Sequence, residues 1–526
     1  MSAHVDPFVR DHLPPRSQWP ALTFTLPELQ FPSLYNASSM LDRAVASGYG
    51  ARDAVLLDTE RVTYAALLQE ACRIAHVLTH EYGLAPGNRV LIHASNTRLS
   101  LPVWWGVFRA GGVAVGTMPM LRAHELAVIL NKAQISHAIV DTHRAGELEQ
   151  ARGEAPVLRH IITTEALERR MAQAPSGFAA VETAADDPAL IAFTSGTTGT
   201  PKGCVHFHRD IAAMAETFSR HVLQPKPEDV FIGTPPFAFT FGLGAGMVFP
   251  ASVGAATAIC EKPGFDVLAD TIERHKATTL FTSPTGYRAL MKQDLRKLAS
   301  LHTCVSAGEH LPQATSDQWF AQTGIRIIDG IGSTEMIHIF VSARGADIRP
   351  GATGKAVPGY EATLLNDDDQ PFEGEGEGRL AIRGPTGCRY LDDARQKNYV
   401  VNGWNVTGDL YRRDADGYFW YVSRADDMII SSGYNIGAPE VENALLTHPA
   451  VAEAAVVGVP DEARGQIVKA FVVLKPGAEI SEKALQDHVK ATIAPYKYPR
   501  AIAFVSELPK THTGKLQRFK LREPGA

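Results

Sequence analysis

The feature that most constrains the fold of this chain is a short apolar segment that runs directly into a loop rich in glycine and hydroxyl groups. Residues 190–193 read LIAF, which has the length and composition of a buried strand. The next ten residues, 194–203, read TSGTTGTPKG. Functional loops lie at the carboxyl ends of strands in open α/β sheets. The sequence therefore predicts an α/β sheet that presents this loop at its edge.

The composition of the loop is suited to binding phosphate. Glycines let backbone N–H groups approach an anion closely, hydroxyls donate hydrogen bonds, and Lys202 adds a positive charge. The loop is not a Walker A motif, because Pro201 and Gly203 flank the lysine. A plain turn is the alternative. The candidate phosphate-binding residues are Thr194, Ser195, Gly196, Thr197, Thr198, Gly199 and Lys202.

Strand-like and helix-like segments alternate along the first half of the chain. Residues 63–83 have the apolar spacing of an amphipathic helix, and residues 102–110 form a second apolar helix pattern. This alternation favours parallel sheets covered by helices. Segments with strand-like patterns are residues 89–95, 137–140, 277–283, 302–308 and 325–333, the last three running into glycine-containing loops.

The length of the chain and a change in its pattern predict two domains. A chain of 526 residues, 45% of them apolar, can bury several cores. From about Gly374 short β elements and tight turns dominate, and a compact α/β unit follows, with helices starting at Pro439 and after Ser481. The polar stretch around Asp426 separates two apolar runs. We therefore predict domains at 1–425 and 426–526.

Charge and cysteine usage exclude several classes of protein. The net charge is −6, from 51 basic and 57 acidic residues, and no basic block is present, which argues against nucleic-acid binding. Five cysteines without CxxC spacing predict free thiols in a reducing compartment and no zinc site. The polar, proline-rich start lacks the apolar core of a secretory signal. We expect a cytoplasmic protein.

One segment is long enough to cross a membrane. Residues 231–260 contain no charged side chain. They are rich in glycine, proline and alanine and poor in leucine and isoleucine, which is atypical of a membrane helix. We interpret this segment as buried core and pocket wall, and we expect no membrane association.

The loop TSGTTGTPKG resembles the phosphate-loop signature of the acyl-adenylate-forming superfamily, which includes acyl-CoA synthetases, luciferase-like enzymes and peptide-synthetase adenylation domains. Further motifs follow in that family's order between about residues 60 and 520. The resemblance implies an α/β fold with a large multi-sheet N-terminal domain and a small mobile C-terminal domain. It also implies ATP, Mg²⁺ and coenzyme A as cofactors.

Residues 329–335, DGIGSTE, resemble the family's second nucleotide motif. The resemblance places Thr334 on the α-phosphate and Glu335 on magnesium, as catalytic residues, which agrees with the preference of a hard cation for carboxylate. A helix start capped by Ser333 or Thr334 is the alternative. Ile331 departs from the family, which commonly has an aromatic residue there against adenine. The other nucleotide-binding residues implied are Gly308, Glu309, Asp329 and Gly330.

Three further motifs lie nearer the C-terminus, two short loops and then a lysine motif. Thr407-Gly408-Asp409 matches the ribose motif, in which Asp409 accepts from the ribose hydroxyls and Arg424 joins it, and Asp426 is implied as the hinge. Ser432 and Gly433, in SSGYNI, match the loop beside the pantetheine tunnel. A simple turn remains the alternative for each of these short motifs.

Lys515, in PKTHTGK, matches the family's catalytic lysine. Attack of a carboxylate on a phosphate brings two anions together, and a lysine that contacts both can orient them and offset their charge. A solvated basic tail is the alternative. The resemblance further implies that the C-terminal domain swings about Asp426 after acyl-AMP forms, removing Lys515 and admitting the CoA thiol.

Residues 236–244, PFAFTFGLG, match the family's acyl pocket. Aromatic side chains with small neighbours suit a flat ring, although ordinary core packing would also explain the phenylalanines. Residues 329–340 resemble benzoate-CoA ligases, and the N-terminus resembles 2-aminobenzoate-CoA ligases. His338 either contacts a ring substituent or is a core histidine. The predicted pocket wall consists of Phe239, Thr240, Phe241, Gly242, Ala307, Gly332, Ile337 and His338.

The sequence thus predicts an ATP-dependent acid–thiol ligase, monomeric or homodimeric, that converts an aromatic carboxylate of the benzoate or 2-aminobenzoate type to its CoA thioester. A ligase for a short or medium aliphatic acid is the nearest alternative. A non-catalytic acyl-adenylate-binding protein would be expected to lack Glu335, Asp409 or Lys515, and all three are present. A luciferase-type oxygenase would share only the first half-reaction.

Overall fold

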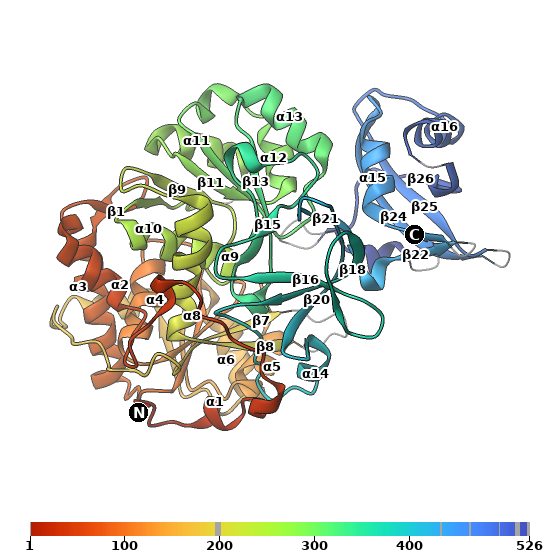
Figure 1. The fold of residues 1–526 in the computed structure, drawn as a ribbon. Helices are drawn as coiled ribbons and strands as arrows, with labels where there is room; N and C mark the ends of the chain where they lie inside the picture. Colours follow the sequence, from red (N-terminus) through yellow and green to blue (C-terminus); the bar gives the residue numbers. More distant parts are fainter. Residues whose placement is uncertain are drawn as a thin grey trace.

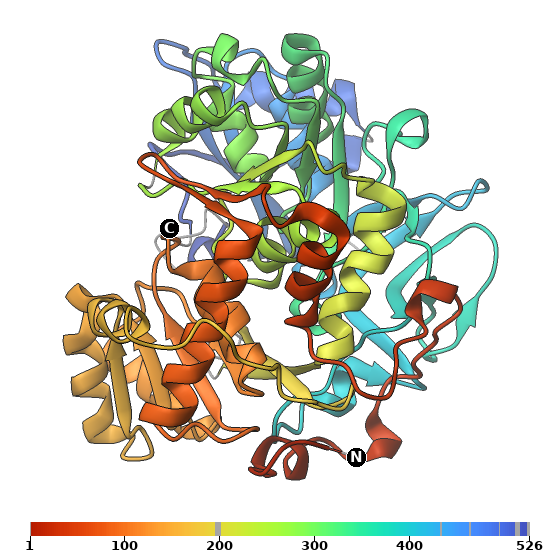
Figure 2. The same cartoon turned by 90° about the vertical axis from the view of Figure 1, so that its left-hand side faces the viewer.

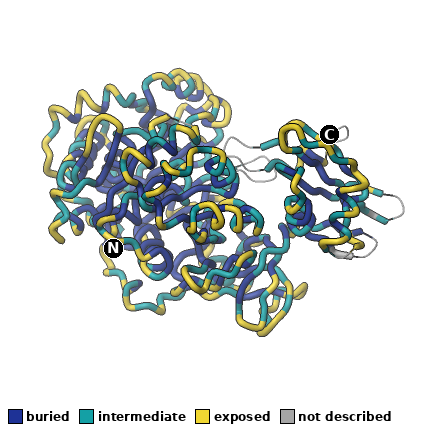
Figure 3. Tube along the Cα trace, turned by 90° about the horizontal axis from the view of Figure 1, so that it is seen from above, coloured by how far each residue is buried: buried dark blue, intermediate teal, exposed yellow. Residues whose placement is uncertain are grey.

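The computed structural model comprises a large body and a smaller C-terminal unit that lies beside it (Figure 1). The segments that it describes are residues 2–194, 201–262, 264–431, 434–461, 464–493, 495–510 and 516–522. Buried residues fill the interior of both parts, and the exposed ones follow the outer loops and helices (Figure 3). The chain passes from the large body to the smaller unit near a short 3-10 turn, η11 (Ala425–Asp427). The predicted domain boundary at Asp426 stays a prediction.

A six-stranded sheet carries the predicted phosphate loop. Its strands β6, β5, β3, β4 and β7 are parallel, and β8 pairs antiparallel with β7. The predicted strands at 89–95, 137–140 and 190–193 all occur in this sheet. In spatial order the strands are β6 (His160–Thr163), β5 (His137–Val140), β3 (Arg89–His93), β4 (Val113–Gly116), β7 (Pro188–Thr194) and β8 (Lys202–Phe207).

A nine-stranded sheet forms the second layer. Strands β1, β10, β9, β11, β12 and β13 are neighbours in that order, and each neighbouring pair is parallel. At one end of the sheet β2 pairs antiparallel with β1. At the other end β14 pairs antiparallel with β13, and β15 with β14. The predicted strands at 277–283, 302–308 and 325–333 are β11, β12 and β13. In spatial order the strands are β15 (Lys355–Ala356), β14 (Ile339–Ser342), β13 (Ile327–Gly332), β12 (Thr303–Ser306), β11 (Thr279–Thr282), β9 (Val230–Gly233), β10 (Ala256–Ala258), β1 (Asp53–Leu56) and β2 (Arg61–Thr63).

Helices cover these sheets, as the alternating pattern predicts (Figures 1 and 2). The helix predicted at 63–83 is α3 (Tyr64–His76), followed by a π-helical turn, Val77–Glu81. The Thr63 hydroxyl caps it by accepting from the backbone N–H of Ala66 at 3.2 Å. Among the described residues, the other α-helices of the large body with at least six residues are α2 (Ser39–Ala44), α4 (Ser100–Arg109), α5 (Ala123–Lys132), α6 (Ala145–Glu154), α7 (Thr164–Met171), α8 (His208–Met214), α11 (Phe265–His275), α12 (Pro284–Leu290) and α13 (Gln313–Thr323).

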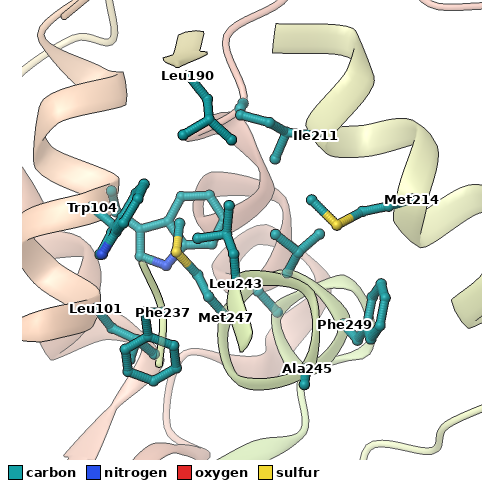
Figure 4. Packing of buried hydrophobic residues seen from close by; sticks show 14 of the residues in the cluster. Leu101, Trp104, Leu190, Ile211, Met214, Phe237, Leu243, Ala245, Met247 and Phe249 are labelled. Atoms are coloured by element: carbon teal, nitrogen blue, oxygen red, sulfur yellow. The ribbon is translucent and has the colours of Figure 1, made fainter. Parts of the chain in front are cut away.

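The uncharged segment 231–260 is folded into short elements inside the large body. It contains α9 (Thr240–Leu243), a π-helical turn (Gly244–Val248), α10 (Phe249–Val253) and strand β10. Side chains of this segment pack against those of α4 and α8 (Figure 4). Among the described residues, no helix combines the length and apolar composition that crossing a bilayer requires.

The pattern change after Gly374 corresponds to an antiparallel sheet and the C-terminal unit. The antiparallel strands are β16 (Glu361–Leu365), β17 (Pro371–Phe372), β18 (Gly376–Arg383), β19 (Val400–Val401), β20 (Trp404–Arg413) and β21 (Phe419–Arg424). The elements of the C-terminal unit are β22 (Ile429–Ser431), β23 (Tyr434–Ile436), α15 (Ala438–Leu446), β24 (Val451–Asp461), β25 (Gly465–Leu474), α16 (Glu482–Thr492), β26 (Ala501–Phe504) and α17 (Arg518–Leu521).

Candidate active site

The carboxyl ends of three parallel strands bring several predicted site residues to one edge. Thr282 of β11 lies opposite Ser306 of β12, and Ser306 lies opposite Asp329 of β13. The chain leaves β12 through Ala307 and Gly308, while β13 continues through Gly330 to Gly332. Predicted acyl-binding and nucleotide-binding residues are therefore adjacent at this edge of the sheet.

The 3-10 turn η9 (Thr334–Met336) places Glu335 beside the first of the two sheets. The Ser333 hydroxyl caps the turn by accepting from the backbone N–H of Met336 at 3.2 Å, so the capped helix start that the sequence offered as an alternative is present. Glu335 is only 7% exposed. The Lys202 ammonium on β8 lies 3.6 Å from the Glu335 carboxylate. The structure thus joins a residue of the phosphate loop to the predicted metal-binding carboxylate.

One face of strand β8 lies beside this turn. Alternate residues Lys202, Cys204 and His206 point the same way along the strand. The Nε2 atom of His206 lies 2.7 Å from the carbonyl oxygen of Thr334. Burial alone would lower the pKa of His206, but its contacts with Cys204 and Asp210 raise that pKa to about 10. Because a carbonyl oxygen can only accept, Nε2–H of His206 donates to Thr334 and holds the backbone of the turn.

The predicted ribose residues face each other across a strand pair. Asp409 of β20 is paired in register with Arg424 of β21, and the Arg424 guanidinium donates to its carboxylate at 3.2 Å. Asp409 is 8% exposed. Gly408 has φ +78°, and a Cβ atom there would lie 3.1 Å from the Arg424 guanidinium. A glycine before Asp409 thus permits both the turn of the backbone and the close approach of Arg424.

The loop after β12 is connected to this strand pair. Gly308 has φ +86°, and the Thr285 hydroxyl donates to the Glu309 carboxylate at 3.1 Å. The next residue, His310, stacks on the ring of Tyr421 in β21 with centroids 5.0 Å apart. Nearby, burial raises the pKa of Asp329 to about 8. Its Oδ1 atom is buried and has no hydrogen-bond partner among the described residues.

Aromatic rings surround His338 behind the same edge. The His338 ring centroid lies 5.7 Å from that of Phe241, 4.6 Å from Phe249 and 5.3 Å from Phe218. Burial lowers the pKa of His338 to about 3, although the backbone of Phe241 acts in the opposite direction. Both ring nitrogens are buried without a hydrogen bond of ordinary geometry to the described chain. His338 is therefore neutral, in an almost wholly apolar setting.

Close backbone approaches shape this aromatic region. A Cβ atom on Gly332 would lie 2.7 Å from the carbonyl oxygen of His338, and one on Gly242 would lie 2.1 Å from that of Pro236. Ile337 is fully buried and has φ +67°. Phe239 and Thr240 begin α9, and Ala307 is buried at the end of β12. The role of these residues as a pocket wall stays a prediction. Sequence alone did not single out Phe218 and Phe249, which pack against His338, or Phe281, which packs against Phe241.

Several predicted site residues lie outside the part of the chain that the structure describes. They are Ser195, Gly196, Thr197, Thr198, Gly199, Ser432, Gly433 and Lys515, and the side chain of Asp426 is likewise not described. Their predicted roles stay predictions. Thr194 and Lys202, which flank the phosphate loop, belong to adjacent antiparallel strands and are paired in register.

Sequence reasoning missed three polar residues at the site. Tyr390 donates from its hydroxyl to Glu335 at 2.5 Å, the Tyr399 and Ser333 hydroxyls are 3.0 Å apart, and His206 contacts Thr334. No local motif marks the two tyrosines. The alternation of Lys202, Cys204 and His206 directly after the phosphate loop is the one signal that could have indicated His206.

Comparisons with known proteins agree with this arrangement. The family described as AMP-binding enzyme matches residues 42–389, and the AMP-binding enzyme C-terminal domain matches residues 440–515. The chain is 36% identical over 514 residues to benzoate–CoA ligase of Thauera aromatica, covering 95% of this chain and 98% of that protein. It is 35% identical over 480 residues to human mitochondrial acyl-coenzyme A synthetase ACSM4, covering 86% and 82%.

A solved structure extends the comparison to three dimensions. The anthranilate CoA ligase AuaEII, crystallised with anthranoyl-AMP, has a TM-score of 0.89 and 34% sequence identity, with 94% of this chain and 98% of that chain covered. The chain therefore belongs to the AMP-binding enzyme family. It is an AMP-forming carboxylate–CoA ligase, a class that uses ATP, Mg²⁺ and coenzyme A, and it has the predicted fold of a large α/β N-terminal part and a smaller C-terminal part.

Proposed function

We propose that this ligase activates an aromatic carboxylate of the benzoate or 2-aminobenzoate type as its acyl-AMP and then transfers the acyl group to the thiol of coenzyme A. The observation that carries the proposal is the aromatic setting of His338, with Phe241, Phe249 and Phe218 around it at the edge that leads to Thr334. Flat rings pack well against such faces and edges. Similarity to a benzoate–CoA ligase and an anthranilate CoA ligase supports the same substrate class.

The nucleotide would be held by residues from several strands. Thr194, Lys202 and the loop between them would bind the phosphates, with Thr334 on the α-phosphate. Asp409 and Arg424 would bind the ribose, and the loop of Gly308 and Glu309, with Asp329 to Ile331, would line the adenine. The His310–Tyr421 stack supports this assignment because it joins the adenine loop to the ribose strands.

Glu335 is the residue that fits a magnesium ion. Magnesium is usually bound by one or two carboxylates together with phosphate oxygens, so a single carboxylate beside a phosphate loop suffices. Glu335 meets this condition because it is nearly buried and lies beside Lys202. When bound, the ion would neutralise negative charge on the phosphates.

Lys515 would orient the attacking carboxylate and offset its charge in the first step. Motion about Asp426 would then remove it and bring Ser432 and Gly433 to the pantetheine arm. In the second step a C–S bond forms as the bond to AMP breaks, and the thiol loses its proton. No residue is assigned as the base that accepts it.

The test is a panel of single acids incubated with Mg·ATP and the purified protein, following AMP release with and without CoA. The panel consists of benzoate, 2-aminobenzoate, 4-hydroxybenzoate, phenylacetate, butyrate and octanoate. We expect CoA-dependent turnover with benzoate or 2-aminobenzoate as the best substrate. Highest kcat/KM with octanoate or butyrate would refute the aromatic assignment and leave the ligase class intact.

A variant pair links the result to the proposed pocket. Phe241→Leu removes a ring that contacts both His338 and Phe281, so the ratio of kcat/KM for benzoate to that for butyrate should fall at least about ten-fold. Phe320→Leu is the control, since Phe320 is 38% exposed on α13. An unchanged ratio in the Phe241 variant would contradict the proposed role of the ring.

A further inference from the structure

A buried tyrosine connects the phosphate-loop lysine to the acidic residue of the turn. Tyr390 belongs to a segment that adds to the free side of β8: Leu391 N donates to the carbonyl of Gly203 at 2.8 Å. Cys204 and Tyr390 form an antiparallel bridge. On the other side, the backbone N–H of Tyr390 donates to the Gln396 side-chain oxygen at 2.8 Å. The backbone of Tyr390 is therefore fixed from two directions.

The hydroxyl of Tyr390 makes two directed contacts. It donates to Oε1 of Glu335 at 2.5 Å, and it accepts from the Lys202 ammonium at 2.8 Å. The directions follow from chemistry, because an ammonium group can only donate and a carboxylate only accepts. The ordinary pKa of a tyrosine phenol is about 10, so the hydroxyl is protonated at neutral pH. The phenol therefore keeps its proton and remains a donor to the carboxylate.

These contacts involve only one of the two carboxylate oxygens of Glu335. Lys202, like Tyr390, lies near Oε1, at 3.6 Å. Within the described chain, side-chain contacts thus engage Oε1 and leave Oε2 as the oxygen that can face a cation. A carboxylate anchored through one oxygen presents the other in a defined direction, which lowers the ordering cost of binding.

We propose that Tyr390 is a positioning residue that orients Glu335 toward the magnesium ion of the bound nucleotide. Without a nucleotide, the ammonium of Lys202 donates to the Tyr390 hydroxyl. When that ammonium binds the phosphates instead, the hydrogen bond from Tyr390 to Glu335 remains. The proposal rests on the proposed function, in which Glu335 binds magnesium. It adds a residue 55 positions away in sequence that belongs to none of the motifs recognised in the sequence.

The test compares Tyr390→Phe with Tyr64→Phe in the full chain. Tyr64 is the matched control, because its hydroxyl is also buried and donates to a carbonyl, that of Ala255, at 2.6 Å. Binding of Mn²⁺ in the presence of ATP, without acid or CoA, is measured by electron paramagnetic resonance. We expect the Kd for Mn²⁺ to rise about ten-fold or more in Tyr390→Phe, as for loss of a hydrogen bond to a charged group, and to stay within about two-fold in Tyr64→Phe.

Two further variants separate positioning from folding. If Tyr390→Phe does not fold, 4-aminophenylalanine and 4-fluorophenylalanine at position 390 provide similar shapes, and only the first has an N–H donor. Weak Mn²⁺ binding in the fluoro variant with recovery in the amino variant supports the proposal. Equal affinities in both, or a wild-type Kd in Tyr390→Phe, would overturn it.

Glu335→Gln distinguishes this proposal from the proposed function. If Glu335→Gln binds Mn²⁺ with wild-type affinity, the assignment of Glu335 to the metal fails, and the role of Tyr390 falls with it. If Glu335→Gln loses binding and Tyr390→Phe does not, only the role of Tyr390 is refuted. The KM for the acid should change less than about two-fold in Tyr390→Phe, because the tyrosine contacts the metal side of the site.

Discussion

Four histidines of the large body are held neutral by burial. Burial lowers the pKa of His93 and of His310 to about 4, and it lowers the pKa of His208 and of His338 to about 3. An unfolded histidine titrates near 6.5, so below that pH the unfolded chain binds protons that the folded chain does not. The stability contributed by these residues is complete above pH 6.5 and is lost progressively as the pH falls toward 3 or 4.

His338 offers a direct test of this acid sensitivity. Replacing it with leucine removes the titrating group, so unfolding stability should fall less between pH 7 and pH 5 than in the wild type. The expected difference is about 2 kcal/mol, from 1.5 pH units at about 1.4 kcal/mol each. Urea unfolding at both pH values measures it, and comparing pH values within each variant cancels the cost of lost packing. Equal pH dependence in the two proteins would show that His338 titrates in the folded chain as it does in the unfolded chain.

At the scale of elements, sequence patterns located the structure where the determinants are local. Strand β5 coincides with residues 137–140, and the helices predicted from residue 63 and after Ser481 begin there, with Thr63 and Ser481 as their caps. Asp409 and Arg424, predicted from separate short motifs, are paired in register. The role of Tyr390 could not be predicted in this way. It depends on contacts with Lys202 and Glu335, 188 and 55 residues away, which only the packing of β8 against η9 creates.

The proposed acyl pocket depends on the conformation of the segment that leads into α9. A Cβ atom on Gly242 would lie 2.1 Å from the carbonyl oxygen of Pro236 and 2.5 Å from that of Pro235. Gly242→Ala must therefore displace this segment, which carries Phe239 and Phe241. We expect at least a ten-fold higher KM for the aromatic acid, a stability loss of about 1–3 kcal/mol, and little change in the KM for ATP.

A control for this variant is available on another helix. Gly146 lies in α6, and a Cβ atom there meets nothing within 4 Å. Gly146→Ala should leave both KM values unchanged. Steady-state kinetics for acid and ATP, with thermal unfolding of each variant, measure the comparison. A normal acid KM in Gly242→Ala would contradict a role of α9 in the acyl pocket.

At the scale of the whole molecule, the smaller unit has cores of its own, and a polar contact is among those that the described residues make with the large body. Ile436, Val456 and Val472 are among its buried residues. Asn443 of α15 lies 3.4 Å from His310, the residue that stacks on Tyr421. A small unit with its own core and a polar contact surface can move relative to its partner without exposing a large apolar area. The proposed rotation of the smaller unit between the two half-reactions would depend on such motion.

Lys515→Ala tests whether the two half-reactions use the smaller unit differently. Lysine is proposed to act only while the carboxylate attacks the phosphate, so the variant should lose acyl-AMP formation by about 100-fold or more. Its reaction of supplied benzoyl-AMP with CoA should stay within about three-fold of the wild type, because that step does not use the lysine. Rapid-quench assays of each half-reaction measure these rates, with Lys520→Ala as the nearby basic control. Loss of both half-reactions in Lys515→Ala, with Lys520→Ala unaffected, would mean that Lys515 acts in both steps. Rotation of the smaller unit away from the site would then no longer be needed to explain the reaction.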